Sequence, residues 1–144
     1  MTIKPREKTA MYLVDTSVWI KIFRDRTGSA RKSFEDLVGD ENIYLSRFTQ
    51  MELLQGCKDD REWRLLQAYL NDQDYIEQNS GSWVDAARIY YDLRRQGLTP
   101  RNSIDCCIAG LAIAHELILL HDDRDFELIQ QVRSLQCSRL LPTT

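Results

Sequence analysis

Long apolar runs are missing from this chain of 144 residues. No stretch approaches the roughly 20 apolar residues that a membrane-spanning helix needs, so the sequence predicts no membrane segment. Residues 1–10 are polar and basic and lack the apolar middle of a secretory signal, so we expect a flexible N-terminal extension there. The hydrophobic share of 43% and the charged share of 28% are typical of globular proteins. This composition predicts a single domain over residues 11–144.

Paired cysteine motifs are missing as well. Cys57, Cys106, Cys107 and Cys137 form no C-x-x-C pair, and their spacing matches no zinc site. Cys106 and Cys107 are neighbours inside an apolar run that looks helical. We therefore expect the four cysteines to be small core residues of a protein kept reduced in the cytoplasm.

An excess of positive charge is also missing, because the formal net charge is −3. Proteins that bind nucleic acid usually carry a basic face, so this value argues weakly against that class. Two basic clusters nevertheless occur, the first at Arg24, Arg26, Arg31 and Lys32 and the second at Arg94, Arg95 and Arg101. Each cluster can be a solvated face or a contact for phosphate groups, and the sequence leaves both interpretations open.

Short apolar strands alternate with helices along the chain. Strands are predicted at 11–14, 43–45 and 117–120, with a marginal strand at 75–76 and a last edge strand at 137–141. Helices are predicted at 17–23, 30–38, from Ser46 or Thr49 to 55, 60–70, from Ser80 or Ser82 to Gly97, 104–115 and 125–132. Strands separated by helices imply parallel pairing with right-handed crossovers. We predict an α/β protein with three layers, α/β/α, around a short central parallel sheet.

Acidic residues follow two of the predicted strands. Asp15 directly follows the first strand, and the cluster Asp122, Asp123 and Asp125 follows the strand at 117–120. The carboxyl ends of parallel strands meet at one edge of the sheet, where such folds bind ligands. We therefore expect these acids to meet there. An aspartate before a helix can also be an ordinary N-cap, and for Asp15 the two roles can coexist.

Two further acids lie in apolar helical segments. Glu52 stands in the segment Gln-Met-Glu-Leu-Leu-Gln-Gly, and Asp105 is the only charged residue between 103 and 114. Glu52 has a simpler interpretation as the capping-box partner of Thr49, three residues earlier. Asp105 has one as a first-turn acid that gains from the helix dipole. Buried acids are costly unless neutralised, so four that converge indicate a divalent cation and metal-assisted hydrolysis of a phosphodiester.

The acidic segments together resemble the motifs of PIN-domain nucleases. Four segments carry the resemblance, in order along the chain: Val14–Ser17 with Val-Trp-Ile after it, Gln50–Gly56, Ile104–Ala112 and Leu119–Phe126. Their order, their spacing and the total length are similar to those of VapC-like toxins of bacterial and archaeal toxin–antitoxin pairs. The resemblance covers nearly the whole chain from Met11 onward.

The resemblance implies an endoribonuclease that depends on Mg²⁺ or Mn²⁺, often forms a homodimer and is silenced by an antitoxin encoded beside it. The core metal acids would be Asp15, Glu52 and Asp105. The fourth acid would be Asp123, with Asp125 as the second choice and as a further possible metal ligand. Ser17 would hydrogen-bond a carboxylate or a metal-bound water. The weaker candidates for contact with RNA are Arg24, Arg26, Arg94 and Arg101.

Two other classes fit part of the pattern. A haloacid-dehalogenase-like phosphatase also begins with an aspartate after a strand and ends with an acidic loop. That chemistry wants a second acid two residues on, where this chain has Ser17. A non-catalytic receiver-like binding module would want adjacent acids early in the chain, whereas here the adjacent acids, Asp122 and Asp123, come last.

Overall fold

The structure is a computed structural model that describes residues 10–140. Except for its last residue, the predicted N-terminal extension therefore lies outside the described residues. The strands are β1 (Met11–Val14), β2 (Asn42–Ser46), β3 (Tyr75–Ile76), β4 (Ile118–His121) and β5 (Cys137–Arg139). The helices are α1 (Thr16–Arg24), α2 (Ser29–Val38), α3 (Arg47–Gln55), α4 (Asp60–Asn71), α5 (Ser82–Arg95), α6 (Ile104–Ala114) and α7 (Asp125–Ile129).

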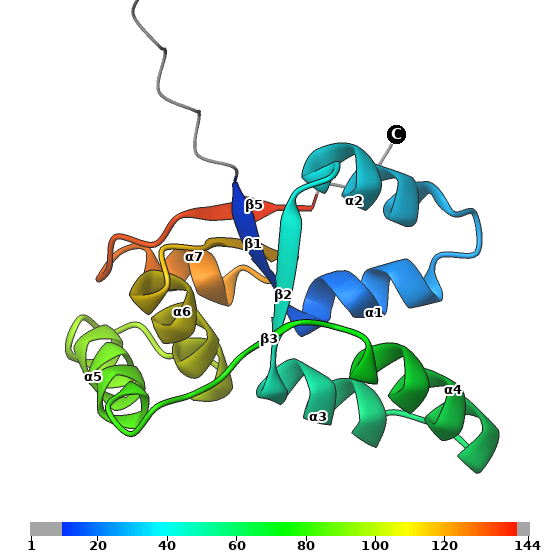
Figure 1. Ribbon diagram of the computed structural model, residues 1–144. Helices are drawn as coiled ribbons and strands as arrows, with labels where there is room; N and C mark the ends of the chain where they lie inside the picture. Colours follow the sequence, from blue (N-terminus) through cyan, green and yellow to red (C-terminus); the bar gives the residue numbers. More distant parts are fainter. Residues whose placement is uncertain (1–9, 141–144) are drawn as a thin grey trace, which may run out of the picture.

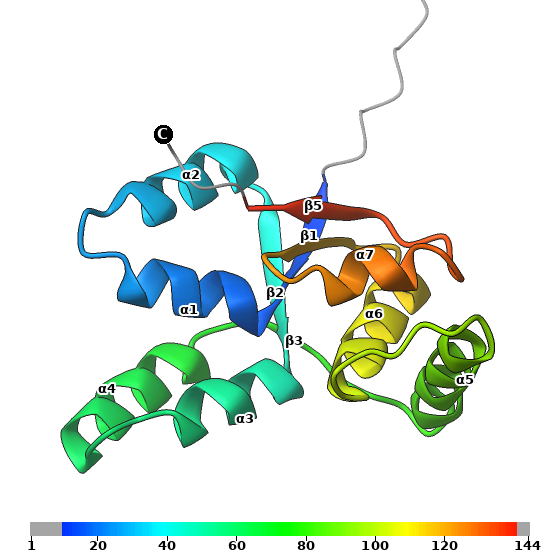
Figure 2. The same ribbon diagram turned by 180° about the vertical axis from the view of Figure 1, so that it is seen from behind.

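The five strands form one sheet in the order β3-β2-β1-β4-β5, and all four pairings are parallel. Helices α5, α6 and α7 lie on one side of this sheet and α1 to α4 on the other (Figures 1 and 2). The side chains of β1 alternate between two cores, since Leu13 packs toward α5 and α6 while Tyr12 and Val14 pack toward α1 and α2. The predicted three-layer α/β/α fold with a short parallel sheet is confirmed.

The strand order places a ligand-binding edge between β1 and β4. From β1 the chain builds the sheet outward through β2 and β3, and the later strands β4 and β5 extend it on the other side. At such a switch point the two neighbouring connections leave in opposite directions and open a crevice at the carboxyl ends of the strands. The residue after β1 is Asp15, whose backbone N–H donates to the Leu120 carbonyl oxygen of β4 at 2.9 Å. The acidic loop after β4 therefore lies next to Asp15.

Several predicted boundaries shift in the structure. Of the two candidate caps for α3, Ser46 is the one used, and its hydroxyl accepts a hydrogen bond from the Thr49 backbone N–H. The sequence predicts that helix α7 ends at Val132, but in the structure it ends at Ile129. The backbone N–H groups of Gln131 and Val132 form tighter i→i−3 bonds instead. None of the helices within residues 10–140 is long and apolar enough to cross a membrane.

Candidate metal centre

Three carboxylates meet at the carboxyl edge of the sheet. One oxygen each from Asp105, Asp123 and Asp125 can be chosen so that all three lie within 4.8 Å of one another. Asp105 is in the first turn of α6, Asp123 is in the loop after β4, and Asp125 begins α7. Asp15 and Glu52 are not members of this tightest group, but both are close enough to act on its charge. The structure thus brings the predicted acids into one region, with the tightest cluster formed by three of them.

Asp15 is buried at the end of β1 and caps α1. Its carboxylate accepts hydrogen bonds from the backbone N–H of Ser17 at 3.0 Å and from the Ser17 hydroxyl at 2.6 Å. Burial raises the pKa of Asp15 to about 6, against the lowering effect of the two bonds from Ser17. The negative charges of Glu52 and Asp123 contribute to this rise. Asp15 therefore combines the two roles expected for it from the sequence, a helix cap and a member of an acidic site.

The pKa of Asp105 is raised more than that of Asp15. Desolvation in the apolar start of α6 is the first cause, and together with the neighbouring negative charges it raises the pKa of Asp105 to about 8. In decreasing order the contributing charges are those of Asp15, Asp123, Asp125 and Glu52. A first-turn position should stabilise an ionised acid through the helix dipole. Burial and repulsion outweigh that benefit here, so a helix-dipole role alone does not account for Asp105.

Glu52 is held by a threonine network rather than by a capping box. Because α3 is capped by Ser46, Glu52 lies in the second turn, and its Oε1 accepts a hydrogen bond from the Thr16 hydroxyl at 2.9 Å. The Thr16 hydroxyl is also 2.9 Å from that of Thr49, which is fully buried. The capping-box interpretation of Glu52 is therefore wrong. Thr16, which follows Asp15, links the end of β1 to helix α3.

Ser17 joins both halves of the site. Its hydroxyl donates to Asp15 at 2.6 Å and accepts the backbone N–H of Asp122 at 2.9 Å. The carboxylate after β1 and the loop after β4 are thus held by a single side chain. An acid at position 17 would place a second negative charge beside Asp15, whereas the hydroxyl both donates and accepts.

His121 supports the acidic loop. The side chain is buried at the end of β4, and its Nδ1 accepts the backbone N–H of Asp123 at 3.1 Å. Burial lowers the pKa of His121, which favours the neutral imidazole that can accept this bond. Its place directly before the acidic loop was the signal in the sequence that could have identified it.

Asp122 belongs to a different set of contacts from Asp123 and Asp125. Lys21 forms an ion pair with it at 3.1 Å, and Arg139 forms another at 3.3 Å. The carboxylate is therefore already balanced by two cations that connect α1 and β5 to the loop. Of the three acids that follow β4, Asp122 is the one that holds the loop in place.

The four arginines predicted to contact RNA are not gathered in one place. Arg24 is the last residue of α1, a nine-residue helix that starts beside Asp15, so it lies about 13 Å along the axis from the site. Arg26 follows it in the exposed connection to α2, and Arg94 is exposed near the end of α5. Arg101 is the exception, because its guanidinium contacts Asp123 at 2.6 Å and Asp125 at 3.2 Å.

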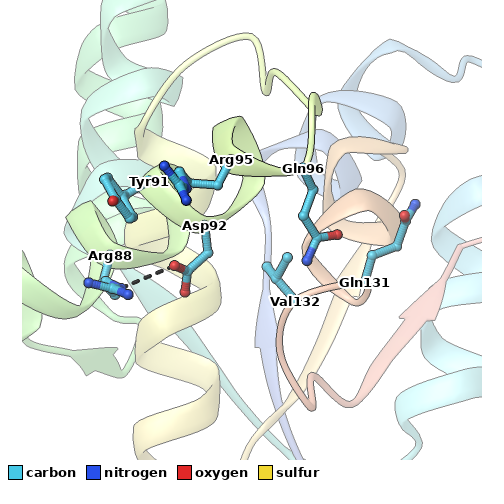
Figure 3. Close-up of a pocket in the computed structure, with 7 residues that line it drawn as sticks. All are labelled: Arg88, Tyr91, Asp92, Arg95, Gln96, Gln131 and Val132. Carbon is cyan, nitrogen blue, oxygen red and sulfur yellow. Dashed lines mark hydrogen bonds and ion pairs between the residues drawn. The ribbon is translucent and has the colours of Figure 1, made fainter.

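A cavity of about 350 Å³ opens at the mouth of the cluster. It is lined by two acids and three arginines, namely Asp122, Asp123, Arg101, Arg124 and Arg139. A second cavity, of about 380 Å³, lies between α5 and the residues after α7. Its lining includes Asp92, which is ion-paired with Arg88 at 3.1 Å (Figure 3). No acid of the cluster lines this second cavity, so the first is the one connected to the carboxylates.

The donor set fits a hard divalent cation. Carboxylate oxygens are the ligands that Mg²⁺ and Mn²⁺ favour, and these ions usually keep several waters beside one or two carboxylates. Burial, and after it repulsion between the acids, raises the pKa of Asp15 and Asp105. A bound cation would reverse that repulsion. Within residues 10–140 no cysteine or histidine belongs to the group, which argues against a zinc site of the sulfur or imidazole type.

Comparisons with known proteins agree with this geometry. The family model of the PIN domain matches residues 12–131. The VapC ribonuclease Mb1587 of Mycobacterium bovis is 35% identical over 133 residues, covering 89% of this chain and 98% of the relative. Ribonuclease VapC51 of Mycobacterium tuberculosis is 29% identical over 131 residues, covering 91% of this chain and 93% of that one.

Solved structures share the fold at lower identity. A chain in the crystal structure of DNA-bound VapBC from Salmonella typhimurium superposes with a TM-score of 0.74 at 20% identity, covering 92% of this chain and 99% of that one. A chain of VapBC2 from Rickettsia felis gives 0.73 at 20% identity, covering 90% and 98%. The segment matched by the family model contains all five acids of the site, namely Asp15, Glu52, Asp105, Asp123 and Asp125. The protein therefore belongs to the PIN-domain family and, within it, to the VapC ribonucleases.

Proposed function

We propose that this protein is an endoribonuclease that hydrolyses RNA phosphodiester bonds with Mg²⁺ or Mn²⁺ and acts as the toxin of a toxin–antitoxin pair. The observation that carries the proposal is the convergence of Asp105, Asp123 and Asp125 within 4.8 Å at the switch point of the sheet. The relatives at 35% identity are named as ribonucleases, which supplies the substrate. The PIN family match leaves no place for the phosphatase and receiver alternatives suggested by the sequence.

The residues divide the work at the site. Asp105, Asp123 and Asp125 would hold the divalent ion, with Asp15 and Glu52 completing the acidic set beside it. When bound, such an ion activates water and offsets negative charge on the phosphate in the transition state. Ser17 and His121 position the carboxylate of Asp15 and the loop of Asp123 through the bonds described above. Between Asp123 and Asp125 we assign the fourth core position to Asp123, because its charge acts on both Asp15 and Asp105.

The RNA strand would enter through the cavity at the mouth of the cluster. Three arginines line that cavity and supply positive charge next to the carboxylates, whereas the protein as a whole is acidic. Guanidinium groups pair well with phosphate oxygens, so this lining suits a nucleic-acid backbone. Arg101 is the best placed of the arginines predicted from the sequence. Arg24, Arg26 and Arg94 remain predictions for more distant parts of the strand.

A cognate antitoxin and a second copy of the chain are the proposed protein partners. Solved structures of the same fold are VapBC complexes, and the resemblance implies homodimers. Exposed large apolar side chains offer surfaces for such partners. Phe23 lies on α1 and Trp63 and Tyr69 lie on α4, while Met51 and Trp83 border a largely apolar cavity of about 500 Å³. We further propose that the protein acts in the cytoplasm, where its RNA substrate is found.

Expression in cells tests the proposal with a matched pair of variants. Asp15→Asn keeps a side chain that can cap α1 but removes the negative charge from the site. Asp59→Asn makes the same change at the N-cap of α4, where Asp59 accepts the backbone N–H of Glu62 at 2.8 Å. We expect growth arrest from the wild type and from Asp59→Asn, and none from Asp15→Asn.

Purified protein gives the second arm of the test. The wild type should cleave RNA with Mg²⁺ or Mn²⁺ and stop when EDTA is added. Folded wild type that neither arrests growth nor cleaves RNA with excess Mn²⁺ would overturn the proposed function. Cleavage that continues unchanged in EDTA would overturn the metal dependence alone.

A further inference from the structure

Arg101 is a basic side chain that enters the acidic cluster from the surface. It lies in the loop between α5 and α6, four residues before Asp105. Its Nη2 donates to Asp123 at 2.6 Å and its Nε donates to Asp125 at 3.2 Å. Among residues 10–140 no other basic side chain forms an ion pair with an acid of the cluster. One guanidinium therefore bridges two of the three clustered carboxylates.

The exposure of the three groups gives the direction of approach. The Arg101 side chain is 71% exposed, whereas those of Asp123 and Asp125 are 18% and 4% exposed. The guanidinium thus covers the carboxylates from the solvent side, where the lined cavity opens. An ion arriving from solvent reaches the same two carboxylates from the same side. A guanidinium and a divalent cation at that distance would also repel each other.

The backbone of the loop has a separate anchor. The backbone N–H of Arg101 donates to Asp125 at 3.3 Å, independently of the side chain. The loop can therefore stay in place when the guanidinium leaves, since only the rotatable side chain has to swing into the open cavity. This arrangement suits a side chain that occupies the cluster in one state and leaves it in another.

We propose that Arg101 is the built-in counter-cation of the acidic cluster in the metal-free protein, and that the divalent ion must displace it in order to bind. The inference rests on the proposed function, because it assumes that these acids hold a metal. The bridge stabilises the metal-free fold by neutralising two clustered acids. It also weakens metal binding, because each ion that binds has to break two charge-assisted hydrogen bonds. After displacement the guanidinium is at the mouth of the site and available to an RNA phosphate.

The test compares Mn²⁺ binding by full-length wild type, Arg101→Gln and Arg101→Lys, measured by titration calorimetry or by the loss of the free Mn²⁺ EPR signal. Removing the guanidinium should tighten Mn²⁺ binding by about five- to tenfold, a modest factor because the side chain is largely exposed. The lysine variant should fall between the two, since an ammonium cannot make the forked contact. Without metal, Arg101→Gln should unfold at a lower temperature than the wild type.

Arg139→Gln is the matched control. Arg139 also bridges two acids, Asp122 at 3.3 Å and Glu127 at 3.1 Å, and it borders the same cavity, but it does not touch the cluster. Lys21 keeps its own ion pair with Asp122 at 3.1 Å, so the loop should stay anchored and the Mn²⁺ affinity of this variant should equal that of the wild type. A general loss of positive charge near the site would instead tighten binding equally in both variants, and that result would overturn the inference.

Two other outcomes decide the matter. If Arg101→Gln and Arg101→Lys are folded and bind Mn²⁺ no more tightly than the wild type, Arg101 is a support of the site and not a competitor, and the inference is wrong while the proposed function stands. If the wild type itself binds no Mn²⁺, the proposed function fails and the inference fails with it.

Discussion

Two acids on packed neighbouring helices, Asp92 on α5 and Asp105 on α6, have opposite electrostatic surroundings. Asp92 forms ion pairs with Arg88 at 3.1 Å and with Arg133 at 2.9 Å. The bond from Arg133 is the main reason why the pKa of Asp92 lies below its usual range. Asp105 is buried among like charges, and its pKa rises to about 8. Asp92 is balanced within the chain, whereas Asp105 calls for a cation from outside it.

The contrast separates a structural acid from a functional one by its partners and not by its residue type. Asp92 ties α5 to Arg133 beyond α7, beside a cavity that contains its own counter-charges (Figure 3). Asp105 forms no ion pair within the described residues, and without metal its negative charge lowers the stability of the folded protein. A buried acid that lowers stability is retained for what it binds. The following experiments test that distinction.

Catalysis should show the largest difference. Asp105→Asn should lower the rate of RNA cleavage by about 100-fold or more, because it removes a charged ligand from the cluster. Asp92→Asn should stay within about twofold of the wild type. The measurement is the initial rate on a labelled RNA at saturating Mn²⁺. Equal losses in the two variants would mean that fold integrity, and not the metal site, controls the rate.

The second largest difference should be in how much Mn²⁺ stabilises Asp92→Asn and Asp105→Asn against thermal unfolding. At a Mn²⁺ concentration about 100 times its Kd, the unfolding temperature of the wild type and of Asp92→Asn should rise by about 5–10 °C. Asp105→Asn should show a small rise or none. Thermal unfolding followed by circular dichroism, with EDTA as the reference, gives the values. A full shift in Asp105→Asn would remove this acid from the metal site.

The pH dependence of metal-free stability should separate the wild type from Asp105→Asn. In the unfolded chain Asp105 loses its proton near pH 3.8, and in the folded chain near pH 8. Between these values the folded state binds more protons, so the free energy of unfolding contributed by this group falls as the pH rises. The wild type should therefore lose stability from pH 5 to pH 8 more steeply than Asp105→Asn in urea titrations with EDTA. Parallel slopes would contradict the raised pKa.

Asp92 should give the smallest effect and the opposite sign. Its pKa is lowered in the folded state, so its contribution to stability is present at neutral pH and is lost as the pH falls below the usual value of 3.8. Asp92→Asn should lower the unfolding temperature at pH 7 by about 1–3 °C, because both ion pairs are partly exposed. The difference from the wild type should shrink steadily as the pH falls below 3.8. A larger loss would show that the contact with Arg133 holds α5 in place.

The sequence was sufficient for the parts of the site that depend on strand ends. Asp15 and the loop after β4 were expected to meet because buried parallel strands deliver their next residues to one edge, and the backbone bond from Asp15 to Leu120 bears this out. The three-layer order follows in the same way from alternating strands and helices. These features depend on backbone topology, which apolar patterning determines.

Contacts made by side chains across loops could not be read from the sequence. Glu52 looked like a capping-box residue of Thr49, but Ser46 caps the helix and Thr16 takes the Glu52 carboxylate. Nothing in the local sequence of Arg101 indicates that its side chain contacts Asp123. These pairings depend on distances of a few ångströms between separate elements, and no local pattern encodes them.

The pairing of β1 with β4 has a consequence for synthesis. Asp15 leaves the ribosome early, but β4, which hydrogen-bonds beside it, and the acids Asp123 and Asp125 are encoded more than 100 residues later. A growing polypeptide therefore has no complete acidic pocket until residue 125 has been translated. For a member of a ribonuclease family, this order predicts that a nascent chain that has not yet reached Asp125 cannot cut the message from which it is being made.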